Sequence, residues 1–128
     1  MDIQFRDGLL FTSIVVTFRG ASKTIENIVI DTGAAETIIS PDAVEEIGII
    51  AELTDTVNSF YGVGGSLHSF FSKNVEQIEL GIVNLKEIKL DFGVIDPRGN
   101  INGLLGLDLL MKLGAIIDFK SLELTIGI

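Results

Sequence analysis

Hydrophobic and polar residues alternate along most of the chain with a period of two, which is the pattern of β-strands that bury one face. Asp7-Gly8 lies between the first two alternating runs and predicts a tight hairpin turn. Residues 20–23 and Gly81 mark two further turns. The strands predicted from this pattern are residues 3–6, 9–18, 24–30, 37–39, 57–61, 66–71, 75–80, 85–95 and 104–105.

Two stretches break the alternation and predict short helices. Ser40 is expected to cap the first helix, with Pro41 at its first position and Gly48 at its end. Residues 107–113 are rich in leucine and predict the second helix, which Gly114 ends. Two short helices in a mostly β chain predict a closed barrel or a sandwich.

Length and composition limit the class of protein. With 128 residues the chain is long enough for one core, so we expect a single domain over residues 1–128. Hydrophobic residues make up 47% of the chain, but no apolar run approaches the ~20 residues of a membrane span. The absence of cysteine excludes disulfides and leaves the compartment open. Because the first residues carry no secretory signal either, we expect a soluble, cytoplasmic protein with no membrane span.

Charge and metal-ligand patterns exclude several further classes. The net charge is -9 and the nine lysines and arginines are scattered, so nucleic acid is not expected as a partner. The single histidine, His68, lies in an alternating run and is expected to be a solvated strand residue. Residues 98–109 resemble a calcium loop at their centre, but Arg98 and Leu109 stand where the loop needs acids. We therefore expect neither a metal nor a cofactor.

The segment Asp31-Thr32-Gly33-Ala34 is the most informative in the chain. It follows Ile28-Val29-Ile30, so a carboxylate stands where a buried strand breaks into a turn. Gly33 lets backbone N–H groups approach that carboxylate, and the Thr32 hydroxyl can fix the turn from behind. An ordinary turn at the end of a strand would use the same residue types. The apolar residues on both sides favour a catalytic carboxylate instead.

A second informative stretch is residues 101–110. Leu104-Leu105 predict a short buried strand, and Gly106 would let that strand pack closely against another backbone. By itself this stretch would be interpreted as part of the core.

Three motifs, taken in order, resemble the retropepsin family, the single-domain aspartic proteases of retroviruses and their bacterial and eukaryotic relatives. The motifs are residues 28–34, the glycine-rich segment Gly62-Val63-Gly64-Gly65, and residues 103–110, followed by residues 115–119. The resemblance implies a mostly β fold, a closed antiparallel barrel of the acid-protease type with two short helices.

The resemblance also implies roles for individual residues. Asp31 would be catalytic together with Thr32 and Gly33, and Leu104-Leu105-Gly106 would pack behind the catalytic loop. A mobile flap would form around the glycine-rich segment. The residues predicted to contact substrate are Ala34, Gly62, Val63, Gly64, Gly65 and Leu105.

Aspartic proteolysis needs two carboxylates around one water, with a single shared proton, so that one is the base and the other the acid. The chain has one D-T-G triplet and no internal repeat. A homodimer that brings Asp31 of each subunit together is the simplest solution. The predicted function is therefore a homodimeric aspartic endopeptidase (a hydrolase) acting on a peptide or protein substrate. Two alternatives stay open: a catalytically silent module for peptide binding or self-association, and a subunit that pairs with a different D-T-G chain.

Two positions depart from the viral pattern. Viral members commonly carry an acid directly after D-T-G-A and an arginine after the glycine of the later motif, where this chain has Ala35 and Leu107. Because both partners of that ion pair are missing together, we expect a different dimer interface. Asp108 is expected instead to accept a hydrogen bond from Thr37.

Overall fold

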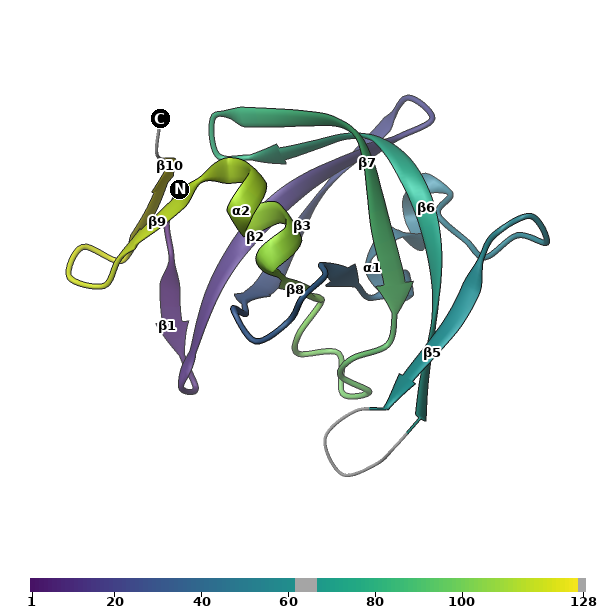
Figure 1. Cartoon of the computed structure of the whole chain (residues 1–128), viewed down its shortest axis with the longest axis horizontal. Helices are drawn as coiled ribbons and strands as arrows, with labels where there is room; N and C mark the ends of the chain where they lie inside the picture. Colours follow the sequence, from purple (N-terminus) through teal and green to yellow (C-terminus); the bar gives the residue numbers. More distant parts are fainter. Residues whose placement is uncertain (62–66, 127–128) are drawn as a thin grey trace.

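The computed structural model describes residues 1–61 and 67–126. The strands are β1 (Gln4–Arg6), β2 (Leu9–Phe18), β3 (Ala21–Ile30), β4 (Ile38–Ile39), β5 (Val57–Tyr61), β6 (Leu67–Leu80), β7 (Val83–Gly93), β8 (Gly103–Leu105), β9 (Ala115–Asp118) and β10 (Glu123–Ile126). The helical segments are α1 (Pro41–Val44), the 3-10 turn η1 (Glu45–Ile47) and α2 (Leu107–Leu113). The predicted class, mostly β with two short α-helices, is confirmed (Figure 1).

Eight of the strands form one sheet in the order β1-β2-β3-β8-β4-β7-β6-β5. Because β2 also pairs with β6, the strands from β2 to β6 close into a ring. The ring is mostly antiparallel, with β3–β8 and β4–β7 as its two parallel pairs. β3 and β8 can pair in parallel because residues 31–102, which include β4 to β7, form the long crossover between them.

The parallel pair β3–β8 sets the position of the loop after β3. Its register places Ile28 beside Gly103 and Ile30 beside Leu105. A Cβ atom on Gly103 would lie 2.8 Å from the carbonyl oxygen of Ile38, so β8 fits between β3 and β4 only with glycine there. This close packing brings the segments that follow β3 and β8 together at one end of the sheet.

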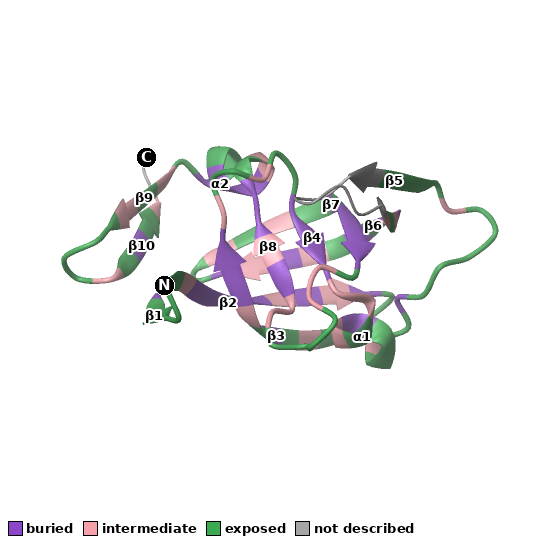
Figure 2. Cartoon of the chain, turned by 90° about the horizontal axis from the view of Figure 1, so that it is seen from below, coloured by how far each residue is buried: buried purple, intermediate pink, exposed green. Residues whose placement is uncertain are grey.

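The core lies inside the ring of strands and consists mainly of isoleucine, leucine and valine. Buried residues are concentrated on β8, β4 and the strands beside them (Figure 2). Phe71 of β6 and Phe92 of β7 stack with their ring centroids 5.4 Å apart. Each fully buried aliphatic side chain stabilises the fold by about 1.5–3 kcal/mol. The fully buried side chains include Ile14, Ile25, Ile28, Ile39, Ile78, Leu90, Leu105 and Leu109.

Several predicted boundaries were wrong. The predicted strands 66–71 and 75–80 are one strand, β6, because the polar residues between them find partners: Ser72 bonds to Asp91, and Lys73 is described below. β3 begins at Ala21 because the turn before it is only Arg19-Gly20, with φ values of 49° and 83°. At the start of α1, Ser40 makes no side-chain cap.

β9 and β10 form a separate hairpin that lies at the edge of the molecule (Figure 1). The amino-terminal residues pair with it, since Leu124 N donates to Met1 O at 2.9 Å and Ile3 N donates to Leu122 O at 3.0 Å. The amino-terminal residues therefore lie beside β10, the last strand of the described residues. Among the described residues, no helix has the length and apolar character needed to cross a lipid bilayer.

Candidate functional site

Asp31 lies directly after β3, where the strand ladder ends. Its backbone N–H donates to Leu105 O at 3.0 Å, which extends the pairing of β3 with β8 by one residue. The chain then turns, and Ala34 N donates to Asp31 O at 3.2 Å. Gly33 N donates to Oδ1 of Asp31 at 2.9 Å, so the backbone of the turn orients the carboxylate. The side chain of Asp31 is thereby held at the end of a rigid strand.

The start of α2 braces this loop from behind. Leu107 N donates to Ala34 O at 2.8 Å and Asp108 N donates to Ala35 O at 3.1 Å. A Cβ atom on Gly106 would lie only 2.7 Å from the carbonyl carbon of Glu36 and 2.9 Å from Ala34 O. The glycine is therefore needed for two backbones to approach each other here.

Thr37 and Asp108 join the two segments, and the predicted hydrogen bond between them is confirmed. The Thr37 hydroxyl donates to Oδ1 of Asp108 at 2.7 Å, and the Thr37 backbone N–H donates to the same oxygen at 3.0 Å. The Thr37 hydroxyl also accepts a bond of 3.0 Å from Gly106 N, which the sequence did not reveal. Since Thr37 is only 1% exposed, these bonds form away from solvent.

Glu36 stands beside Lys89 and Asp91 of β7, a cluster that sequence reasoning missed. Lys89 Nζ lies 3.3 Å from Oδ1 of Asp91 and 3.9 Å from Oε2 of Glu36. The pKa of Glu36 is raised, chiefly because its side chain hydrogen-bonds to Asp91 and also because Asp91 carries a like charge. The sequence feature that could have indicated this cluster is Asp91, an acid that stands among apolar residues near the end of a strand.

A second missed cluster fixes the segment before β5. The ammonium group of Lys73 on β6 lies 2.7 Å from Oδ2 of Asp55 and 2.8 Å from Oε1 of Glu52, and its side chain is 5% exposed. Burial alone would lower the pKa of Lys73, but the bonds to the two acids outweigh it and leave that pKa raised. The bond from Lys73 lowers the pKa of both carboxyls. The cluster therefore anchors residues 52–55 to β6.

The other residues predicted for the site lie around Asp31 as follows. Thr32 and Gly33 are exposed, and Ala34 is half-buried. Leu105 is fully buried behind the loop, where its carbonyl oxygen supports Asp31; its contact with substrate stays a prediction. The predicted flap residues Gly62, Val63, Gly64 and Gly65 lie outside the described residues.

Comparison with known proteins identifies the family. The family model described as aspartyl protease matches residues 14–109, so the chain belongs to the aspartyl protease family. No curated protein sequence gives a match.

Solved structures confirm the retropepsin-like fold. A retropepsin-like aspartic protease from Rickettsia conorii has a TM-score of 0.60 and 21% identity, over 91% of this chain and 82% of that one. The retroviral protease-like domain of Ddi1 from Leishmania major has a TM-score of 0.64 and 16% identity, over 93% and 88% of the two chains. The EIAV protease, solved with the inhibitor HBY-793, has a TM-score of 0.63 and 19% identity, over 91% and 98%.

Proposed function

We propose that this chain is one subunit of a homodimeric aspartic endopeptidase and that residues 1–128 form its single retropepsin-like domain. The observation that carries the proposal is the geometry of Asp31. Its carboxylate stands at the end of β3 and accepts a hydrogen bond of 2.9 Å from Gly33 N, while its backbone N–H donates to Leu105 O at 3.0 Å. A carboxylate held in one orientation can act as a general acid or base. For aspartic proteolysis it requires a second carboxylate beside it.

The second carboxylate would come from an identical subunit. The sequence holds one D-T-G triplet, so a two-fold axis beside Asp31 would pair it with its copy. In this arrangement the two side chains hold one proton and one water between them. The ionised carboxylate takes a proton from the water, whose oxygen attacks the carbonyl carbon of the peptide bond, while the protonated carboxyl donates to the carbonyl oxygen.

Neighbouring residues would assist this chemistry. Thr32 is exposed in the single chain, so its hydroxyl is available to bond to the opposite catalytic loop. Ala34 stands beside Asp31 and would line the substrate cleft together with the glycine-rich segment. The names of the Rickettsia and EIAV neighbours, a retropepsin-like aspartic protease and a protease bound to an inhibitor, support a peptide substrate for this chain.

The test is Asp31→Asn, which keeps the shape of the side chain but cannot accept the proton of the water. We expect hydrolysis of a peptide library to be abolished while the unfolding midpoint stays unchanged. Asp42→Asn, at an exposed position in the first turn of α1, is the matched control and should keep full activity. If Asp31→Asn cleaves peptides as fast as the unmodified protein, Asp31 is not the base.

Two further measurements separate this function from its alternatives. Activity should follow a bell-shaped pH profile with an optimum on the acid side of neutrality, because only the singly protonated pair is active. Sedimentation should give a dimer whose mass is twice that of the 13.8 kDa chain. A dimer that binds peptides and never cleaves them would instead support the silent binding module.

A further inference from the structure

An open pocket of about 650 Å³ lies between the β1–β2 turn, β3 and the loop that precedes β8. It gathers two of the three arginines of the chain, Arg6 and Arg98, together with two carboxylates, Asp7 and Asp96. Phe11 and Ile101 supply apolar surface to the same pocket. Pockets of this kind, with apolar walls and a few polar groups, select the side chains of a ligand.

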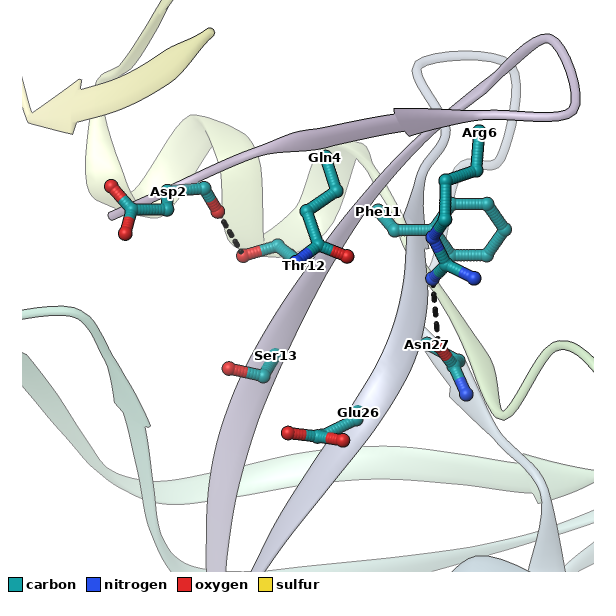
Figure 3. A pocket seen from close by; sticks show the side chains of 8 residues that line it. All are labelled: Asp2, Gln4, Arg6, Phe11, Thr12, Ser13, Glu26 and Asn27. Carbon is teal, nitrogen blue, oxygen red and sulfur yellow. Dashed lines mark hydrogen bonds between the residues drawn. The ribbon is translucent and has the colours of Figure 1, made fainter.

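Arg6 is held in a defined orientation. Its Nη2 donates to Oδ1 of Asn27 at 2.7 Å, and its guanidinium carbon lies 4.0 Å from the centre of the Phe11 ring. Figure 3 shows these three side chains together at an adjoining pocket that they also line. Because Asn27 is neutral, this bond does not neutralise Arg6, and the carboxylates of Asp7, Asp2 and Glu26 line the two pockets with it. In the described part of the chain, neither Arg6 nor Arg98 forms an ion pair with a carboxylate.

The carboxylate of Asp96, which also lines the pocket, is already occupied by its own loop. It accepts backbone hydrogen bonds from Arg98 at 3.0 Å, Asn100 at 2.9 Å and Ile101 at 3.1 Å. Arg6 and Arg98 are the cations among the residues that line the pocket, and their guanidinium groups can donate to a bound carboxylate, while the charge of Arg98 also acts on Asp96. A planar guanidinium binds carboxylates and phosphates through two parallel hydrogen bonds, and the carboxylate is the one of these groups that unmodified peptide side chains carry.

Strand register puts this pocket on the same face of the sheet as Asp31. Phe11 pairs with Val29 across β2 and β3, so the two side chains share a face. Val29 precedes Asp31 by two residues, and alternation places both on that face. From Asn27 at the pocket to Asp31 the strand rises about 13 Å, which an extended peptide covers in about four residues.

We infer that Arg6 and Arg98 form a subsite that selects substrates with an aspartate or glutamate side chain about four residues from the scissile bond. This inference rests on the proposed function, since it places the subsite along the peptide that Asp31 would cut. In a symmetric dimer the subsite would occur on both sides of that bond.

The experiment compares the hydrolysis of paired peptides that carry either glutamate or glutamine at one position and are otherwise identical. In successive pairs this position is moved along the peptide. We expect kcat/KM to be about three- to tenfold higher for the glutamate peptide than for the glutamine peptide at one or two positions. This ratio corresponds to one charged hydrogen bond that is partly exposed to solvent. Arg6→Gln and Arg98→Gln should each reduce this preference, and the double variant should remove it. Arg98→Glu should reverse the preference in favour of a lysine peptide. Arg19→Gln is the matched control, because Arg19 lies outside the pocket and pairs with Glu52.

Binding to the Asp31→Asn variant separates this inference from the proposed function. Fluorescence anisotropy of the same glutamate and glutamine peptides measures selectivity without cleavage. Tighter binding of the glutamate peptide, weakened by Arg6→Gln, supports the subsite even if the unmodified protein cleaves nothing. Cleavage with equal kcat/KM for both peptides at every position would overturn the subsite and leave the protease intact. Equal anisotropy for both peptides, or loss of preference in Arg19→Gln, would also overturn it.

Discussion

The hydroxyl of Thr37 donates a hydrogen bond of 2.7 Å to Oδ1 of Asp108, which lies 71 positions further along the chain. The same hydroxyl accepts a bond from Gly106 N, and the same carboxylate oxygen accepts one from Leu109 N. One pair of side chains thus joins the segment after Asp31 to the start of α2. The position of the Asp31 loop depends on this connection.

Thr37→Val should lower the free energy of unfolding by about 1–3 kcal/mol, because it keeps the side-chain volume but leaves Gly106 N without a partner. The Asp31 loop should loosen as well, so peptidase activity should fall by more than the folded fraction does. Thr17→Val is the control, since the Thr17 hydroxyl bonds to Ser22 in an exposed position. Urea unfolding measures both variants, and an equal loss in the two would contradict the role given to Thr37.

Much of this arrangement could be predicted from the sequence, because local patterns determine it. The bounds of α2 followed from leucine spacing and Gly114, and the bond between Thr37 and Asp108 followed from their places in two motifs. The clusters around Lys73 and Asp91 could not be predicted. The partners in these clusters come from β-strands and loops that are distant in sequence. A polar residue inside a strand interrupts the hydrophobic pattern, so the sequence alone predicts the end of the strand there.

Two glycine substitutions should separate folding from catalysis. In Gly106→Ala the new Cβ would meet backbone atoms of Glu36 and Ala34 at 2.7–2.9 Å, which cannot move aside cheaply. We expect a loss of stability of about 1–3 kcal/mol, as for other overpacked sites. In Gly33→Ala the new Cβ would meet only Oδ1 of Asp31, at 3.1 Å.

Gly33→Ala should therefore keep nearly full stability and lose most activity, because the carboxylate of Asp31 must shift. Thermal unfolding and peptide hydrolysis, measured on the same samples, check both variants. Equal stability of the two proteins would mean that the close approach at Gly106 does not constrain the fold.

Lys73→Met should destabilise the protein by about 2 kcal/mol, because it leaves Asp55 and Glu52 without their shared cation. Arg19→Met removes the exposed bond of Arg19 to Glu52, at 3.3 Å, and the contact of its guanidinium with the Phe18 ring, and should change stability by less than about 1 kcal/mol. If both substitutions give the same small change, the segment before β5 is not anchored by Lys73.

The destabilisation caused by Lys73→Met should depend on pH. The pKa values of Glu52 and Asp55 are lowered, so their contribution is present above their ordinary values of 4.5 and 3.8 and is lost as the pH falls through the lower folded values. The pKa of Lys73 is raised, so its contribution is present below 10.5 and is lost at higher pH. The stability difference between Lys73→Met and the unmodified protein should be constant near neutrality and shrink at strongly acid pH.

Glu36→Gln should change stability with a sign opposite to that of Lys73→Met. The raised pKa of Glu36 means that its protonated form favours folding below its ordinary value of 4.5, and this advantage is lost as the pH rises through the folded value. At neutral pH the charge of Glu36 faces Asp91 and Asp108, with Lys89 as the opposing cation, while Lys112 of α2 lines the same pocket.

Replacing this carboxylate by an amide should therefore stabilise the protein at pH 7, by no more than about 0.5 kcal/mol because Glu36 is mostly exposed, and should change nothing at pH 4. Urea midpoints at the two pH values measure the difference, with Glu45→Gln in η1 as an exposed control. Equal stabilisation at both pH values would show that Asp91 does not act on Glu36.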